Sequence, residues 1–210
     1  MMKSFGFRFA AALLALPLFA TAFAARGEEE TPWFAGKFGT ELVNASGRKV
    51  PAGTALAGKI VGVYFSASWC GPCRGFTPQL VKFHRAAAKR GGMEIVFVSC
   101  DKSQNDMFAY MRKDSMPWLA LPFGSEEGKA LKKELGVNGI PTLVIFGSDG
   151  KLISNNGRWD VVMLGAKALE SWKSPDYKPL TYKDYLEKKG SSSADSRSKA
   201  KGKSKSRRKK

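Results

Sequence analysis

Metal-binding side chains are scarce in this sequence. Its 210 residues include three cysteines and one histidine. A structural zinc site needs four ligands, usually completed by a second Cys-x-x-Cys pair or a pair of histidines. We therefore expect no zinc site, and no motif in the chain indicates another metal or an organic cofactor.

Acidic residues are also few, and the excess positive charge is concentrated at one end. The chain has 18 Asp and Glu against 35 Lys and Arg, a net charge of +17, and residues 188–210 hold 11 of the basic residues beside one acid. This segment has no aromatic or large apolar residue, so we expect a disordered basic tail. Such a tail is attracted weakly to polyanions or an anionic membrane surface, or serves only solubility. Without aromatic rings to stack on bases, specific nucleic-acid binding is not expected.

Charged residues are absent from an apolar run near the N-terminus, residues 9–20. Two basic residues precede the run, and Ala22-Phe23-Ala24 after it has the small-x-small pattern of a cleavage site. We expect a signal peptide over 1–24, a short linker over 25–32, and an exported protein, periplasmic or secreted. The run is short for a membrane span and is broken by Pro17, and an uncleaved anchor is the alternative.

The remaining segment, 33–187, alternates between strand and helix patterns, and we predict one domain there. Continuous apolar β-branched runs predict buried strands, and apolar residues at helical spacing predict helices. The predicted strands are 38–43, 48–50, 59–66, 93–99, 142–146 and 151–154, and the predicted helices are 73–90, 104–113, 125–135 and 161–172. This order predicts an α/β sandwich whose mixed sheet is parallel in its middle, with antiparallel hairpin strands at an edge.

A Cys-Gly-Pro-Cys motif lies where the strand 59–66 gives way to a helix. The sequence is Cys70-Gly71-Pro72-Cys73, preceded by Trp69. At a helix start the unpaired N–H groups and the helix dipole lower the pKa of the first thiol, which we expect to be exposed at the end of the strand. A purely structural disulfide is the alternative, but so short a loop stabilises a fold little. The motif therefore predicts a redox site.

Three stretches together resemble the thioredoxin superfamily, and within it the tryparedoxin and nucleoredoxin branch. The first runs from Phe65 to Pro78 as FSASWCGPCRGFTP, the second is Met116-Pro117-Trp118-Leu119-Ala120, and the third is Gly139-Ile140-Pro141-Thr142. The resemblance covers about residues 33–172. It implies a thioredoxin-like three-layer sandwich, with the central sheet flanked by helices.

The resemblance assigns roles around the dithiol. Cys70 would be the nucleophile and Cys73 the resolving thiol. From its position beside Cys73, Arg74 either adds positive charge that favours a thiolate or is only a solvated helix residue. Gly71 departs from the Pro-Pro pair that is usual in this branch. Tyr64 occupies the position where typical thioredoxins carry a buried carboxylate, and a tyrosine is a poor base near neutral pH.

The resemblance also implies a substrate-binding surface. Trp69 and Trp118 would form apolar walls around the site. Pro141 would follow a cis peptide bond, and Ile140 before it would offer its backbone to the substrate.

Three further residues have alternative interpretations. Cys100 is either a third redox thiol or a small buried apolar residue, and we favour the second. His84 is interpreted as a surface residue, not a base. Asp101 is a candidate proton acceptor near the site.

These features predict an exported thiol-disulfide oxidoreductase. It would reduce disulfide-containing protein substrates and would be reset by a separate electron-donor thiol protein. The alternative is a redox-inert or weakly active binding module with the same fold, held to anionic surfaces by the basic tail.

Overall fold

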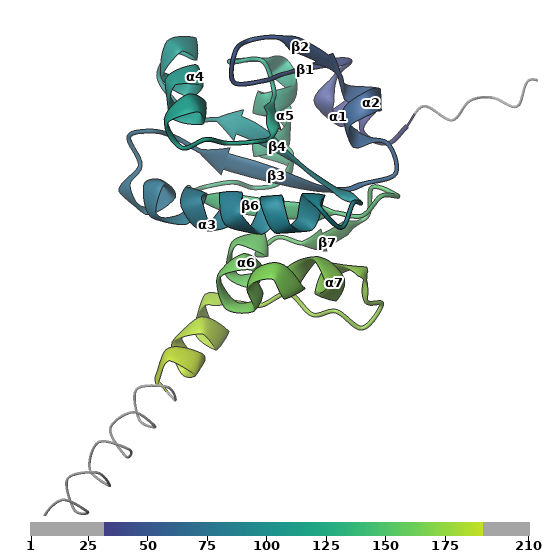
Figure 1. Cartoon of the computed structure of the whole chain (residues 1–210), viewed down its shortest axis with the longest axis vertical. Helices are drawn as coiled ribbons and strands as arrows, with labels where there is room; N and C mark the ends of the chain where they lie inside the picture. Colours follow the sequence, from purple (N-terminus) through teal and green to yellow (C-terminus); the bar gives the residue numbers. More distant parts are fainter. Residues whose placement is uncertain (1–31, 191–210) are drawn as a thin grey trace, which may run out of the picture. The chain divides into compact units, whose positions relative to one another are not determined.

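A computed structural model describes residues 32–190. The predicted signal peptide and linker, except Pro32, and residues 191–210 of the predicted tail lie outside the described residues. The sheet has seven strands in the order β2-β1-β5-β4-β3-β6-β7 (Figure 1). The strands are β1 (Glu41–Val43), β2 (Lys49–Pro51), β3 (Ile60–Ser66), β4 (Met93–Ser99), β5 (Leu119–Ala120), β6 (Thr142–Phe146) and β7 (Leu152–Ser154).

The sheet is mixed, as the sequence predicts, but it has antiparallel hairpins at both edges. Strands β3, β4 and β5 are parallel to one another in the middle. The β1-β2 hairpin forms one edge and the β6-β7 hairpin the other. Gly47 and Gly150 occupy the turns with φ of 81° and 80°, a conformation that glycine adopts without steric cost.

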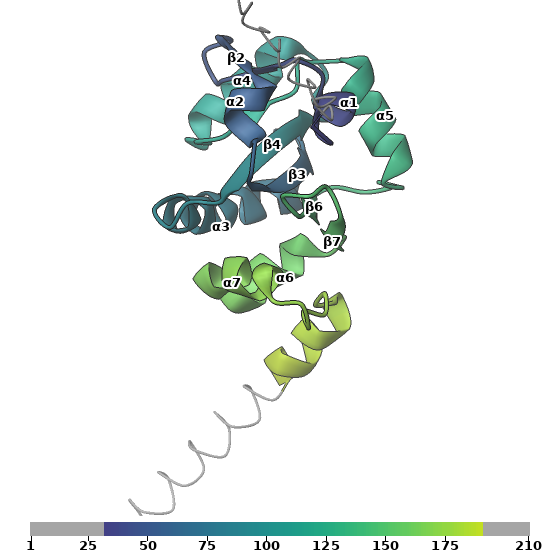
Figure 2. The same ribbon diagram turned by 90° about the vertical axis from the view of Figure 1, so that its right-hand side faces the viewer.

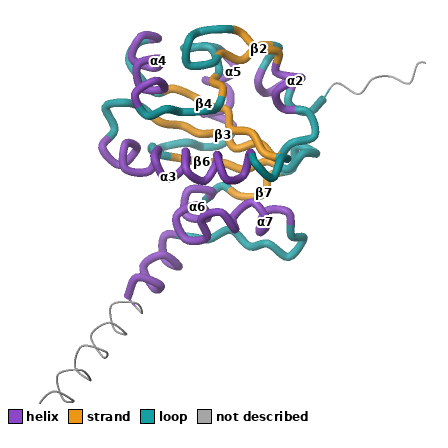
Figure 3. The backbone as a smooth tube through the Cα atoms, in the orientation of Figure 1, coloured by secondary structure: helices purple, strands orange, loops and turns teal. Residues whose placement is uncertain are grey.

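Helices cover both faces of the sheet, which confirms the three-layer sandwich. In Figure 2, α3 and α5 lie on opposite sides of the strands, and in Figure 3 the strands form the layer between the helices. The helices are α1 (Ala35–Phe38), α2 (Ala52–Leu56), α3 (Gly71–Ala88), α4 (Gln104–Lys113), α5 (Glu126–Glu134), α6 (Gly157–Leu164) and α7 (Ala168–Lys173), with a 3-10 turn at Gly165–Lys167.

The alternation of side chains along the central strands divides the core in two. Tyr64 and Phe97 face the side covered by α3, α4, α6 and α7. Phe65 and Val98 face the side covered by α1, α2 and α5. All seven residues of β3 are buried, as expected of a strand with helices on both faces.

The structure differs from the prediction mainly in short elements. Helices α1 and α2 and the two-residue strand β5 were not expected, and the predicted helix 161–172 is divided between α6, the 3-10 turn and α7. Residues 182–190 are helical, so this helix crosses the boundary predicted at 187 and takes residues 188–190 out of the predicted disordered tail. None of the described helices is both long enough and apolar enough to span a membrane.

Candidate active site

The two motif cysteines form a disulfide at the N-terminus of α3. Their Cα atoms are 5.2 Å apart. Strand β3 ends at Ser66, a short loop follows, and Cys70 is the N-cap residue of the helix. Pro72 lies in the first turn, where its fixed φ and missing N–H fit a helix start. The strand-loop-helix order thus places the pair where the motif predicts it.

The two sulfurs differ in their surroundings. The backbone N–H of Cys73 donates to Sγ of Cys70 at 3.2 Å. Cys73 is 0% exposed and Cys70 is 6% exposed, so solvent reaches only the first residue of the pair. The expectation of an exposed thiol on the last strand residue is therefore wrong. Cys70 follows the loop after β3 and is buried there. An N–H donor on Sγ favours a thiolate at Cys70 once the disulfide is reduced.

A second loop closes over Cys70. The Ile140-Pro141 peptide bond is cis, which confirms the prediction. The carbonyl oxygen of Ile140 lies 3.7 Å from Sγ of Cys70. Ile140 is half-buried and packs against the cluster of Ala67, Cys70 and Cys73. The backbone of this loop is therefore beside the sulfur at which a substrate would react.

The loop that carries Trp69 is held by Asp101. Oδ1 of this carboxylate accepts from both the N–H and the hydroxyl of Ser68, each at 2.7 Å, and Oδ2 accepts from the Ser99 hydroxyl at 2.8 Å. The indole N–H of Trp69 donates to the carbonyl oxygen of Cys100 at 3.1 Å, while the side chain stays 58% exposed. Trp69 is thus an exposed apolar surface beside Cys70, and Asp101 holds the loop through hydrogen bonds to both of its oxygens.

A buried network of hydroxyl groups lies behind the disulfide. Thr77 donates its one hydroxyl proton to the carbonyl oxygen of Cys73 at 2.9 Å. The hydroxyls of Tyr64 and Tyr110, at 2.8 and 2.6 Å, must then both donate to the Thr77 oxygen. Ser66 completes the network with a 3.1 Å bond to Tyr110. Burial raises the pKa of both tyrosines, so the network is neutral near neutral pH.

Two predictions about aromatic residues are corrected by burial. Trp118 is 2% exposed and packs edge-on against Tyr64 and His84, so it supports the core behind the site and is not a wall open to substrate. His84 is 5% exposed, and its Nε2 lies 3.2 Å from Oε1 of Glu94. It is therefore not a surface residue. A tryptophan beside a motif can be buried, as Trp118 is, or exposed, as Trp69 is, and the sequence pattern does not distinguish the two cases.

The remaining predicted site residues lie on the outer side of the first turn of α3. Gly71, Pro72 and Arg74 are exposed. A Cβ on Gly71 would meet no atom within 4 Å, so the departure from a Pro-Pro pair is not forced by packing. Arg74 lies near Asp114, on whose carboxyl its charge acts to lower the pKa, although burial dominates and raises it.

Cys100 lies next to the disulfide cluster. It is half-buried and is not bonded to another cysteine. Burial raises the pKa of its thiol, with Lys132 opposing the rise and Asp101 adding to it. The raised pKa disfavours a third redox thiol, while Cys100 is only half-buried and not the fully buried apolar residue that the favoured interpretation describes. The sequence alone did not indicate Ser68, Thr77 or Lys132 as residues of the site. Thr77 had one sequence signal, because it lies four residues after Cys73 and so on the same face of the helix.

Comparisons with known proteins agree with this geometry. Residues 58–152 match the model of a family described as thioredoxin-like. Tryparedoxin from Trypanosoma brucei brucei is 43% identical over 125 residues, which are 59% of this chain and 84% of that protein. The chain belongs to the thioredoxin-like family. This confirms the family predicted from the three sequence stretches and supports an oxidoreductase.

Further relatives define the branch. Probable nucleoredoxin 1 from Arabidopsis thaliana is 45% identical over 128 residues, 60% of this chain and 22% of that protein. The chain spans 22% to 32% of the length of the nucleoredoxins from Arabidopsis thaliana and Danio rerio. The solved structure of tryparedoxin from Trypanosoma brucei superposes with a TM-score of 0.60 at 38% identity, covering 67% of this chain and 97% of that one. The homologues are thus thiol-disulfide oxidoreductases of the nucleoredoxin and tryparedoxin type.

Proposed function

We propose that this protein is an exported thiol-disulfide oxidoreductase that reduces disulfide-containing protein substrates through Cys70 and Cys73. One observation carries the proposal: the disulfide lies at a helix N-terminus, with an N–H on the sulfur of Cys70 and the cis-proline loop beside it. Family membership supports the chemistry. The identity of the substrate rests on the site alone.

The difference in burial between Cys70 and Cys73 supports an order for the steps. In the reduced protein the Cys70 thiolate attacks one sulfur of the substrate disulfide, forming a mixed disulfide and expelling the other sulfur as a thiolate. Cys73 then loses its proton and attacks Sγ of Cys70. The substrate leaves as a dithiol, two electrons richer, and the protein returns to the disulfide seen here. Cys73 cannot take the first step because it has no exposed surface.

A second thiol protein must reduce the disulfide again, because the reaction leaves both electrons on the substrate. The direction of flow follows from the reduction potential of the pair. A value near about −270 mV supports a reductant, and a value near about −120 mV would instead indicate an oxidant.

Substrate trapping tests the proposal. Cys73→Ala removes the resolving sulfur, so we expect a stable mixed disulfide between Cys70 and the substrate. Cys70→Ser should abolish the reduction of insulin while leaving the far-ultraviolet circular dichroism spectrum unchanged. If the cellular phenotype survives Cys70→Ser, the binding module is the better interpretation.

Export and tethering are proposals that rest on the sequence. Residues 1–24 support a cleaved signal peptide and a periplasmic or secreted protein. The N-terminal sequence of the mature protein tests this, and a chain that still begins at Met1 would contradict it. Deleting residues 199–210 tests the tail. We expect weaker binding to anionic vesicles at low salt, and unchanged binding would remove the tethering role.

A further inference from the structure

Two cavities lie between the loops beside the disulfide and helix α5. One cavity of about 350 Å³ is lined by Trp69, Cys100, Lys132 and Ile140, among others. A second cavity of about 310 Å³ is lined by Cys100, Lys132 and Phe123 and continues to the start of α5. The two cavities share Cys100 and Lys132. We call the surface lined by these two cavities, from Trp69 and Ile140 through Cys100 to Lys132, the Lys132 groove.

The end of the groove nearest α5 is lined by charged groups of both signs. Asp101 lies there, and its oxygens accept from the neutral donors of Ser68 and Ser99, which leave its negative charge in place. Lys129 pairs with Glu126 on its own helix at 2.7 Å. Lys132 has no carboxylate within 4 Å among the described residues, and it also lines a third cavity together with Lys133.

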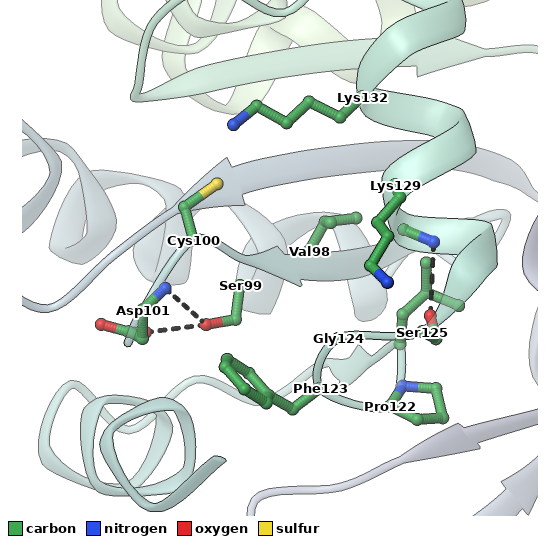
Figure 4. Close-up of a pocket in the computed structure, with 12 residues that line it drawn as sticks. Val98, Ser99, Cys100, Asp101, Pro122, Phe123, Gly124, Ser125, Lys129 and Lys132 are labelled. Atoms are coloured by element: carbon green, nitrogen blue, oxygen red, sulfur yellow. Dashed lines mark hydrogen bonds between the residues drawn. The ribbon is translucent and has the colours of Figure 1, made fainter. Parts of the chain in front are cut away.

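The side chain of Lys132 is directed along the groove. In Figure 4 it extends from α5 toward Cys100, whose sulfur points toward it. Cys100 in turn packs against the cluster that contains Cys70 and Cys73. An ammonium group with no carboxylate within 4 Å in residues 32–190 therefore lines the same cavity as Ile140, whose carbonyl oxygen lies 3.7 Å from Sγ of Cys70.

We propose that the Lys132 groove binds an acidic segment of the protein substrate, with a carboxylate of that segment against the ammonium group of Lys132. The segment would flank the cystine that reacts at Cys70. The inference rests on the proposed function and specifies its substrate class. The ammonium group of Lys132, which has no carboxylate within 4 Å in residues 32–190, and the cavity that it lines together with Trp69 and Ile140 favour an anionic occupant.

Lys132 acts on binding and not on the chemical step. A partly exposed ion pair contributes little, so its loss should lower kcat/KM for an acidic substrate about two- to fivefold, mainly through KM. Salt should reduce the effect because it screens charges at a surface.

Two cystine peptides test the inference with the full chain reduced beforehand. They are identical except that residues flanking the cystine are Glu in one and Gln in the other. We expect wild type to prefer the Glu peptide in kcat/KM, Lys132→Gln to lose this preference, and Lys132→Glu to reverse it. Lys82→Gln is the matched control, because Lys82 is an exposed lysine that lines a different cavity.

The rates on the two peptides distinguish a failure of the acidic-segment inference from a failure of the proposed function. Equal rates on the two peptides in wild type, or an equal loss on both peptides in Lys132→Gln, would overturn the inference and leave the proposed function standing. If wild type reduces neither peptide, the proposed function itself fails, and the inference falls with it. A loss of preference in Lys82→Gln as well would show a general effect of net charge and would also overturn it.

Discussion

Replacing Thr77 with valine keeps the shape of the side chain but removes the oxygen on which two tyrosine hydroxyls converge. Tyr110 would retain its 3.1 Å bond to Ser66, whereas the Tyr64 hydroxyl would lose its 2.8 Å bond to Thr77. A buried polar group without a partner costs about 1–3 kcal/mol, and the lost bond from Thr77 to Cys73 adds about 1 kcal/mol. We therefore expect Thr77→Val to lower the free energy of unfolding by about 2–4 kcal/mol.

Guanidinium denaturation of the oxidised protein, followed by circular dichroism, measures this loss. Thr77→Ser keeps the hydroxyl and is the matched control. Tyr64→Phe removes the hydroxyl that Thr77→Val strands, so the double variant should be more stable than the sum of the single changes by about 1–2 kcal/mol. A loss below about 0.5 kcal/mol in Thr77→Val, or strictly additive changes, would refute the convergence of both hydroxyls on Thr77.

Three further predictions concern stability. Asp101→Ala should lower the free energy of unfolding by about 2–4 kcal/mol in chemical denaturation, because it removes an acceptor of three hydrogen bonds. Asp101→Asn keeps one side-chain oxygen and should lose less. Equal losses in the two variants would contradict the role of that oxygen. Burial raises the pKa of Tyr177 to about 12, so its contribution to stability is present below its ordinary value of 10.0 and is lost as pH rises to about 12. Tyr177→Phe should flatten that fall in a pH series of thermal melts, and an unchanged fall would show that other groups cause it. Gly157→Ala should destabilise by about 1–3 kcal/mol because its Cβ would lie 2.8 Å from Ile145, whereas Gly36→Ala, with no atom within 4 Å, should not.

The long elements were predictable from the sequence because each has a strong local signal. The bounds of β4, α4 and β6 agree with the prediction. Buried apolar runs define the two strands, and Ser103 caps α4 by accepting from the N–H of Asp106. Strand β5 has only two residues and forms through pairing with Phe97 and its neighbour on β4, so no local pattern marks it.

The reacting pair was predictable for a similar reason, whereas its surroundings were not. Cys70 and Cys73 lie within one motif, but Asp101 reaches Ser68 across 33 residues of sequence. Lys132 reaches the groove only because α5 packs on the face of the sheet that also carries Phe65. Contacts of this kind depend on the tertiary arrangement, and a lysine in an amphipathic helix has the same sequence signature whether it borders a site or bulk solvent.

Tyr64 stands where typical thioredoxins carry a buried carboxylate, and the hydroxyl network that it forms behind the dithiol carries no charge near neutral pH. Tyr64 and Tyr110 both donate to Thr77, and burial keeps both hydroxyls neutral, so neither accepts the proton of Cys73 near neutral pH. The nearby carboxylate of Asp101 already accepts three hydrogen bonds. The proton of Cys73 must therefore leave toward the substrate or water when the mixed disulfide opens. The buried side of the site therefore holds the dithiol in place through hydrogen bonds, and the solvent side, with Trp69 and the Ile140 carbonyl, is where the proposed reaction would release its proton.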